Sequence, residues 1–598
     1  QDQGKKEDES IATAYSYDSR GNQTKVTYEN GDYREDTYDA RNLKTVSKYY
    51  QADGTQTLQT NYQYDDQYRL TKMTDAKKSG SEMKAYRYTY TGYDGFGRTA
   101  WTAEVSQEAE PSDAQIAKHK ISYSYDTEDK ITEVTYALAE DGRVESLHYA
   151  YDKNQYLIAI KAKIKGNDEE KLIRKYRYNE RGKLFTIVDF TDYRDKNESY
   201  VARFYEYDTL DRVSSMTYKS GTTVLEAYTY SYDKNNNVVK KTEKNSTAKE
   251  EKDHTDQTTE YTYNALGRLT KSVVTDHKKN EEKTTTTYSY DSAGNRTKKV
   301  KGEEETAYTY NGLNQLLKAK TTKGNTVKND ISYEYDVNGN QIKETDKETG
   351  DSVENTYDVE NRLSTATVTK KKESTSGNET VSLTQENLYN GEGQRIQKKE
   401  AGEVTNYFYE DGMVSYTTGA DTGEKLIQNL SGLEDNVIYA EQKVTGTDGT
   451  ASDYQDFLYT KDIQGSTSSI LNKDTKGELS YEYDDFGETS IHGSSALKNE
   501  ICYTGGIYDE STGLYYLNAR YYDPENGRFL TEDTYRGEVN DPDTLHLYAY
   551  CANDPINYVD PSGHLAIEVA VAYMAGTYLI AWGAYYIFTN SYRWNGKT

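Results

Sequence analysis

Proline and cysteine are both scarce in this chain of 598 residues. There are five prolines, and four of them lie between Pro524 and Pro561. Proline removes a main-chain donor from a β-sheet, so its near absence before residue 524 is typical of uninterrupted strand pairing, and the cluster indicates tight turns. The two cysteines, Cys502 and Cys551, exclude a disulfide scaffold and a four-cysteine zinc site.

Aliphatic side chains are also few. Hydrophobic residues make up 34% of the chain, and that share includes 63 tyrosines. Low aliphatic content with a net charge of −27 is typical of disorder, but disordered chains are poor in aromatic residues. Tyrosine joins a large apolar ring to a hydroxyl and suits surfaces that are neither dry core nor open solvent. The composition therefore predicts much sheet and little dense core.

The acidic balance, with a pI of about 4.9, argues against nucleic acid as a partner of the main body, and its simplest role is solubility. The seven histidines show no metal-ligand spacing and there is no phosphate-binding loop, so we predict neither a metal nor a cofactor. The N-terminus lacks the basic-then-apolar form of a signal peptide. Because the repeats described next begin at Tyr15, we expect a fragment of a longer protein.

A motif of two tyrosines followed by aspartate or asparagine recurs every 20 to 32 residues between about 15 and 410. Tyr-x-Tyr places both rings on one face of a strand, the acidic or amide side chain starts a turn, and glycine or asparagine supplies a left-handed position. Each unit is therefore predicted to be a β-hairpin. Full copies include YSYDSRGNQT (15–24), YSYDTEDKIT (123–132), YRYNERGKLF (176–185), YTYNALGRLT (261–270) and YEYDVNGNQI (333–342).

One hairpin is marginal in water, so neighbouring hairpins must pair edge to edge. The predicted fold is all-β: a long, curving antiparallel sheet that wraps round a hollow. A flat solenoid or a propeller would also satisfy the repeat alone. No helical periodicity is visible before residue 565.

The segment after the repeats carries longer motifs. They are YTKDIQGSTSSILNKDTKGELSYEYDDFGE (459–488), YTGGIYDESTGLYYLNARYYDPENGRFLTED (503–533) and LHLYAYCANDPINYVDPSG (545–563). These motifs and the repeats resemble the Rhs or YD-repeat family, which includes bacterial polymorphic toxins, wall-associated proteins, insecticidal toxin C components and teneurins. The resemblance covers about 15 to 563.

The resemblance implies a spiralling shell, or β-cocoon, closed by a C-terminal plug. It divides the chain into a lead-in (1–14), a YD-repeat shell (15–410), a core or plug region ending in Asp-Pro-Ser-Gly (411–563), and the start of a variable cargo (564–598). Only 35 residues follow Gly563, too few for a folded toxin enzyme.

The function implied is a shell that sequesters its own C-terminal toxin segment for delivery to a target cell. Its implied partners are that segment, an immunity protein for the full-length toxin, and a delivery apparatus acting through an N-terminal part. We expect a secreted or cell-surface bacterial protein, from a Gram-positive host. The alternatives are an adhesion module whose tyrosine ladders bind cell-surface carbohydrate, and a self-processing protease without cargo.

Many family members cut themselves just after the Asp-Pro-x-Gly motif with a pair of aspartates. Two carboxylates held close together cannot both ionise, so one keeps a proton while the other acts as base. We predict Asp533 and Asp554 as this pair and His564–Leu565 as the bond that is cut. The alternative is that Asp-Pro sequences are simply turn formers. The boundary motif comprises Asp560, Pro561, Ser562 and Gly563.

This sequence departs from the family pattern at two of these positions: Asp533 is followed by Thr534 instead of proline, and His564 replaces leucine. Arg520 and Arg528 flank Tyr-Tyr-Asp-Pro and are predicted to pair with carboxylates in the plug.

An uncharged stretch of twenty residues begins at Val569 and ends at Phe588. That length spans a bilayer as a helix, so membrane contact by the cargo is one prediction. The other is an apolar helix packed against protein.

Overall fold

The computed structural model describes most of the chain up to Glu568. The described ranges are 12–137, 142–195, 198–374, 377–410, 412–420, 425–432, 437–444, 453–493, 497–538, 542–564 and 566–568. Leu565 and the predicted apolar helix of residues 569–588 lie outside them. No helix in these ranges is long and apolar enough to cross a membrane.

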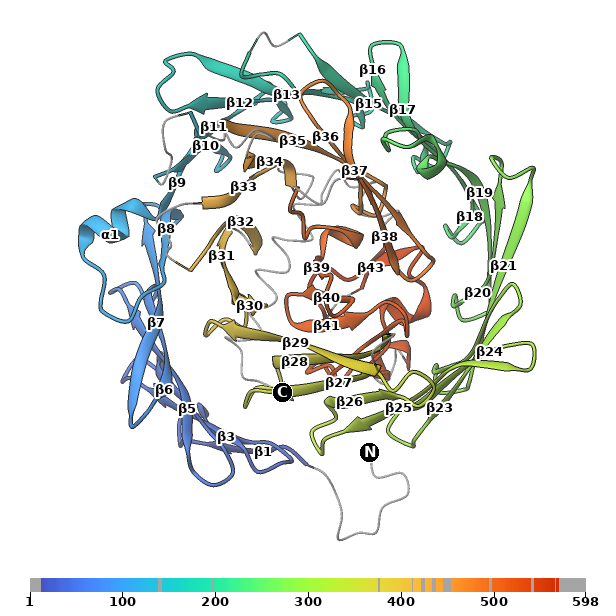
Figure 1. The fold of residues 1–598 in the computed structure, drawn as a ribbon. Coiled ribbons are helices and arrows are strands. Elements are labelled where there is room, and N and C mark those ends of the chain that lie inside the picture. Colours follow the sequence, from blue (N-terminus) through green and yellow to red (C-terminus); the bar gives the residue numbers. More distant parts are fainter. Residues whose placement is uncertain are drawn as a thin grey trace.

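One antiparallel sheet of 38 strands dominates the structure. Each strand pairs with the next one along the chain, from β1 with β2 to β37 with β38. The sheet curves round into a ring-like wall, and the C-terminal strands lie in its centre (Figure 1). The predicted all-β spiral of hairpins with a C-terminal plug is therefore confirmed.

The first half of this sheet contains β1 (Ala14–Tyr17), β2 (Gln23–Thr27), β3 (Tyr33–Tyr38), β4 (Lys44–Tyr50), β5 (Gln56–Tyr64), β6 (Leu70–Ser79), β7 (Glu82–Tyr93), β8 (Thr99–Val105), β9 (Lys120–Tyr125), β10 (Ile131–Tyr136), β11 (Val144–Tyr151), β12 (Leu157–Ile164), β13 (Glu170–Tyr178), β14 (Leu184–Phe190), β15 (Tyr200–Tyr207), β16 (Val213–Ser220), β17 (Thr223–Tyr232), β18 (Val238–Asn245) and β19 (Thr255–Tyr263).

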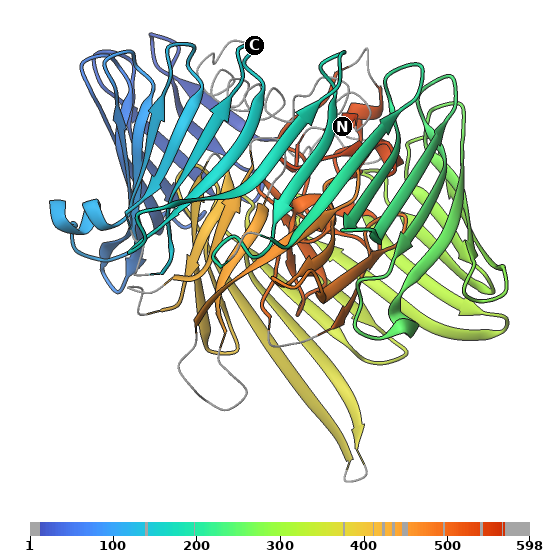
Figure 2. The ribbon, with the colours of Figure 1, turned by 90° about the horizontal axis from the view of Figure 1, so that it is seen from above.

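The second half contains β20 (Leu269–Asp276), β21 (Glu282–Tyr290), β22 (Arg296–Lys301), β23 (Glu304–Tyr310), β24 (Leu316–Lys323), β25 (Thr326–Tyr335), β26 (Gln341–Asp346), β27 (Ser352–Tyr357), β28 (Leu363–Ser374), β29 (Gly377–Tyr389), β30 (Arg395–Glu400), β31 (Glu403–Glu410), β32 (Met413–Thr418), β33 (Lys425–Ser431), β34 (Val437–Val444), β35 (Asp453–Lys461), β36 (Thr467–Leu471), β37 (Gly477–Tyr483) and β38 (Thr489–Gly493). The hairpin of β28 and β29 extends beyond the rest of the sheet (Figure 2).

A smaller sheet forms the plug, with β39 (Ile507–Asp509), β40 (Leu514–Leu517), β41 (Arg520–Asp523) and β42 (Arg528–Phe529). Beside it β43 (Tyr558–Val559) pairs with β44 (Ile567–Glu568). Short 3₁₀ turns are η2 (Glu251–Asp253), η3 (Tyr503–Gly505), η4 (Pro542–Leu545) and η5 (Cys551–Asn553). None of these strands contains proline, as the scarcity of that residue predicts.

The 38-stranded sheet continues past residue 410 and ends at Gly493 in β38. No break in strand pairing marks the predicted boundary at 410/411, and the domain division stays a prediction.

Within the described ranges one α-helix interrupts the strands, at a place where the sequence shows no helical periodicity. This helix, α1 (Asp113–Lys118), follows Pro111 and is capped by Ser112, whose side chain accepts from the main chain of Gln115. A capping box of this kind is a local start signal that acts without helical periodicity. The helix has no buried residue, and it does not alter the sheet.

The repeat motif builds the turn of each hairpin. In one example the Asp94 carboxylate accepts from the main-chain N–H groups of Phe96 and Arg98, at 2.9 and 3.0 Å. Gly97 has a φ of +91°, a conformation that favours glycine. Arg98 pairs with Asp94 at 2.7 Å and lies 4.5 Å from the ring centroid of Tyr125 in the next repeat. The motif therefore fixes the turn and a contact with its neighbour.

The second tyrosine of the motif links successive hairpins. Its hydroxyl donates to the main-chain carbonyl of the first residue of the preceding return strand, as from Tyr207 to Leu184 at 2.7 Å. A register shift at the second tyrosine, as between Glu206 and Tyr207, turns the ring toward that carbonyl. The same bond recurs from Tyr38, Tyr93, Tyr125, Tyr151, Tyr178, Tyr232, Tyr263, Tyr290, Tyr310, Tyr357, Tyr389, Tyr409 and Tyr483.

Side-chain contacts join strands that are separated by about one full turn of the curved sheet. The two partners of such a contact are 326 residues apart near the start of the sheet and 213 residues apart further along it. Each turn of the sheet therefore uses fewer residues than the one before, and the sheet forms an inward spiral. Figure 1 shows β33 to β37 inside β11 to β18. The seam contacts include Arg34–Glu360, Arg194–Asp456, Tyr218–Lys461 and Ser272–Asp485.

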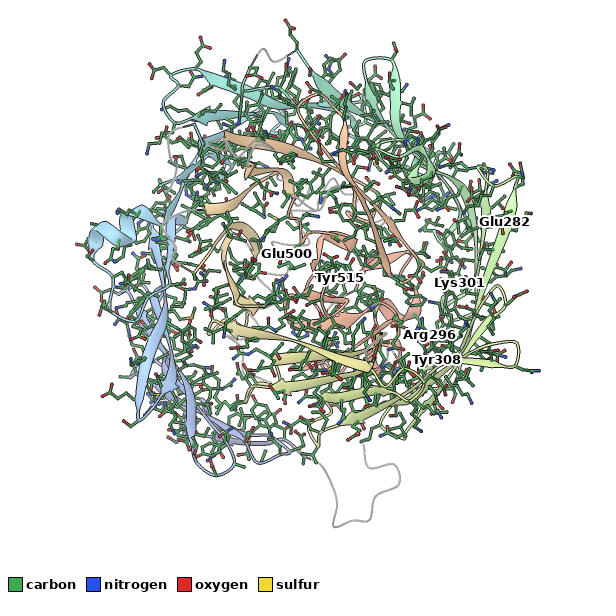
Figure 3. The ribbon with its side chains drawn as sticks, in the orientation of Figure 1. Glu282, Arg296, Lys301, Tyr308, Glu500 and Tyr515 are labelled. Carbon is green, nitrogen blue, oxygen red and sulfur yellow. The ribbon has the colours of Figure 1, made fainter. Side chains whose placement is uncertain are left out.

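The plug is anchored to the wall by polar groups. Arg296 of β22 donates to the carbonyl of Glu525 at 2.9 Å, and its guanidinium lies 4.8 Å from the ring centroid of Phe486. Figure 3 shows Arg296 and Tyr308 on the wall, and Glu500 and Tyr515 in the enclosed centre. Tyr515 belongs to a buried cluster that joins the plug to β34 through β37.

Candidate functional site

The boundary motif lies against the turn between β40 and β41 of the plug. Gly563 has a φ of +73°, and a Cβ there would lie 2.5 Å from the carbonyl oxygen of Leu517. Ala519 donates its N–H to the carbonyl of Ser562 at 3.2 Å, and the Asn518 amide donates to the carbonyl of Pro561 at 3.0 Å. Only glycine fits this close approach, so the motif is held in one place on the plug.

Arg520 is the centre of the site. Its Nη2 lies 2.7 Å from Oδ2 of Asp533 and 3.9 Å from Oδ2 of Asp560. Its Nε donates to the carbonyl of Gly563, and its Nη1 donates to the carbonyl of Leu547 at 3.0 Å. The guanidinium carbon lies 3.6 Å from the ring centroid of Phe529, which shields it from water. One buried cation therefore faces two aspartates and the boundary motif.

Asp533 receives three donors. Arg520 donates to Oδ2, while Oδ1 accepts from the main-chain N–H of Tyr535 at 2.9 Å and from Nδ1 of His564 at 2.8 Å. An ionised carboxylate only accepts, so the His564 ring carries its proton on Nδ1.

Asp560 holds the start of the segment that follows the motif. Its Oδ1 accepts from the Ser562 hydroxyl at 3.0 Å and from the main-chain N–H of His564 at 3.1 Å. The peptide bond between Gly563 and His564 thus has its carbonyl on Arg520 and its N–H on Asp560.

The pKa values of the two carboxyls are shifted in opposite directions. Burial acts to raise the pKa of Asp533, but the Arg520 charge and the His564 hydrogen bond outweigh it and hold that pKa below its usual range. Burial raises the pKa of Asp560, and Arg520, His564 and Ser562 offset only part of this effect. Two carboxyls whose pKa values are moved apart in this way are typical of acid and base pairs in catalytic sites.

The other predicted site residues lie as follows. The carboxylate of Asp554 accepts from the Asn557 side chain at 2.8 and 3.0 Å, and Asp554 caps the C-terminus of η5. Asp554 is not among the groups described as acting on Asp533, with which the sequence predicts it to pair. Arg528 donates to the carbonyl of Asn314 at 2.6 Å and lies 4.9 Å from the ring centroid of Tyr548.

The structure therefore groups Asp533 with Asp560 through Arg520. The sequence predicts Asp560 to be part of a turn, and Asp560 does form one. Its second contact depends on the tertiary packing of the motif onto Arg520. The only sequence signal for that contact is the proximity of two strong motifs.

In the described part of the chain, no group of histidine, cysteine and acidic side chains could hold a metal ion. Both cysteines are buried and unpaired with each other. The arrangement at Arg520 is suited to chemistry on a peptide bond by paired carboxyls, without a metal or a cysteine nucleophile.

Comparisons with known proteins agree with the fold. The family model described as "Teneurin YD-shell" matches residues 146–556. The "tRNA nuclease WapA" of Bacillus subtilis strain 168 is 34% identical over 262 residues, which cover 43% of this chain and 10% of that protein. The "Double-stranded DNA deaminase toxin A" of Burkholderia cenocepacia is 28% identical over 180 residues, covering 29% of this chain and 11% of that protein. The matched part of this chain thus spans only about a tenth of the length of these relatives.

Among solved structures, the "Crystal Structure of TcdB2-TccC3-Cdc42" aligns over 95% of this chain and 34% of that chain, with a TM-score of 0.46 and 15% identity. The family model alone covers more than half of the sequence. The chain therefore belongs to the teneurin YD-shell family, and the resemblance to Rhs and YD-repeat proteins is confirmed.

Proposed function

We propose that this chain is the shell of a polymorphic toxin, which encloses the segment that follows its boundary motif and separates it from the shell by self-cleavage. The observation that carries the proposal is the arrangement at Arg520. Two aspartates with opposite pKa shifts flank the residues at which the plug ends. The names of the nuclease and deaminase relatives support a toxin context.

Asp533 acts as the base and Asp560 as the acid. Asp533 takes a proton from a water molecule, whose oxygen attacks the carbonyl carbon of the residue before the cut. The C–N bond breaks, the leaving nitrogen receives the proton of Asp560, and a new carboxyl and a new amine result. Because the two aspartates then exchange their protonation states through solvent, no other reactant is needed. Arg520 keeps Asp533 charged at the start.

The bond that is cut lies next to His564. His564–Leu565 is the bond implied by the family pattern, and Gly563–His564 is the neighbouring bond that Arg520 and Asp560 hold directly. The mass of the shell fragment distinguishes them, because the two products differ by one histidine.

Intact mass of the denatured protein tests self-cleavage. We expect wild type to give two fragments, and Asp533→Asn and Asp560→Asn to stay intact at 68.3 kDa. Asp554→Asn is the matched control: it is also a buried aspartate of the plug region, and we expect it to be cut. Circular dichroism of each variant checks that it is folded. An intact wild type, or a cut Asp533→Asn, would refute the mechanism.

Retention of the cut segment tests enclosure. After cleavage, the fragment that follows the motif should co-elute with the shell in native gel filtration and separate from it in denaturant. Separation in native buffer would contradict enclosure without affecting cleavage. An immunity protein, a delivery apparatus and secretion are further parts of this proposal. The relatives come from both Bacillus and Burkholderia, so a Gram-positive host stays a prediction.

A further inference from the structure

His564 contacts both carboxyls of the site. Its ring Nδ1 lies 2.8 Å from Oδ1 of Asp533, and its main-chain N–H donates to Oδ1 of Asp560 at 3.1 Å. The side chain is 30% exposed, so the ring is in contact with solvent on one side. His564 directly follows the boundary motif, and within the described residues it is the one beside the motif that bonds Asp533.

We propose that His564 is a positioning residue for its own cleavage: its ring binds Asp533 and holds the residue beside the cut against the base. The inference rests on the proposed function. It adds that one residue of the substrate segment completes the catalytic centre.

The charges around Asp533 support this role. Arg520 contacts Oδ2 of Asp533 through Nη2, and the carboxyl of Asp560 lies 3.9 Å from the same nitrogen. The buried thiol of Cys551 interacts electrostatically with Arg520 and Asp560. Against this background His564 lowers the pKa of Asp533 both by its hydrogen bond and by its charge. Without the His564 ring, the donors to Asp533 that remain are Arg520 and the main-chain N–H of Tyr535.

The geometry also restricts the segment itself. Gly563 is fixed by Arg520 and by the close approach to Leu517, and His564 is fixed at its main chain and its ring. A residue held at two points keeps its carbonyl in a narrow range of positions, and orientation of this kind contributes strongly to hydrolysis rates. A leucine at this position would keep the main-chain contact and lose the ring contact.

The test compares His564→Leu with His564→Asn, whose side-chain amide places a donor near the position of Nδ1. Protein made by pulse labelling in cell-free translation is transferred to buffers between pH 5 and pH 8, and cleavage is followed by mass. For His564→Leu we expect a rate lower by about tenfold, the value of one hydrogen bond to a charged group. We also expect the acid limb of its pH profile to move to higher pH, because the pKa of Asp533 rises. His564→Asn should recover part of the rate.

His492→Leu is the matched control. His492 also faces an aspartate, Asp253 at 3.7 Å, and is 28% exposed, but it lies in β38. It should cleave like wild type. A His564→Leu protein with the wild-type rate and pH profile would overturn the positioning role alone, provided that wild type is cut and Asp533→Asn is not. An intact wild type would overturn both the positioning role and the proposed self-cleavage.

Discussion

Asp75 lies where two successive turns of the spiral contact each other. We expect the stability of this contact to depend on pH. The side chain, in β6, is 1% exposed. Its Oδ1 accepts from the hydroxyl of Thr60 at 2.7 Å and from the main chain of Gly391 in the next circuit, and its Oδ2 has no hydrogen-bond partner among the described residues. Arg362 and Arg87 act on the carboxyl electrostatically.

Burial raises the pKa of Asp75 from 3.8 to about 7, against the partial effect of Thr60, Gly391 and the two arginines. Between these values the folded protein holds a proton that the unfolded chain has lost. Stability is therefore fully present below the unfolded pKa and decreases as the pH rises toward the folded one. The decrease is about 1.4 kcal/mol per pH unit, or about 4 kcal/mol over the whole window.

Hydrogen exchange measured by mass spectrometry gives the local opening free energy of β5, β6 and the 390–393 turn. We expect wild type to lose stability there between pH 4 and pH 8, and Asp75→Asn, which carries no titratable group, to lose about 4 kcal/mol less over the same window. The amide can also change the opening free energy of the variant by an amount that is the same at every pH. Such an amount does not alter how the opening free energy varies with pH. Asp66→Asn, at an exposed aspartate of the adjacent turn, is the control. Parallel curves for wild type and Asp75→Asn would refute this reasoning.

Two further predictions concern the repeat and the plug. Tyr207→Phe removes the hydroxyl that donates to Leu184 and should lower the free energy of opening of β15 by about 1 kcal/mol in the same exchange experiment, whereas Tyr15→Phe, at an exposed ring, should change it little. Arg395→Leu leaves the buried carboxylate of Asp509 without its main partner and should destabilise the plug by about 3–5 kcal/mol in urea unfolding. Replacing both members of this pair with leucine should cost clearly less, and an equal cost would contradict the assignment of the loss to an unpaired charge.

The hairpins could be predicted from the sequence because their signals are local. Two tyrosines, an aspartate and a glycine within seven residues predict a strand end and a turn, and Asp94 with Gly97 forms that turn in a shorter copy of the motif. The spiral could not be chosen over a solenoid or a propeller in the same way. It depends on contacts such as that of Arg34 with Glu360, which join residues 326 apart.

In the candidate site, too, the residues that belong to local motifs could be singled out from the sequence, whereas their tertiary contacts could not. Asp533, His564 and Arg520 could be singled out from motifs, and the structure brings all three together. Asp560 was assigned to a turn because Asp-Pro favours turns, and this local role is real. Its position beside Arg520 results from the packing of one motif on another, which spacing along the chain does not encode.

The site in turn depends on the shell, because the turns of the repeats hold the plug. The Tyr548 hydroxyl donates to the carbonyl of Gly339 at 2.7 Å, and the Asn553 amide donates to the carbonyl of Gly294 at 2.9 Å. Both carbonyls belong to the repeat turns themselves. Tyr548 adjoins Leu547, whose carbonyl accepts from Arg520 and from the N–H of Asp533. The glycine turns that close the hairpins thereby help to set the position of the two aspartates, because Asp533 is bonded to the segment that these turns hold.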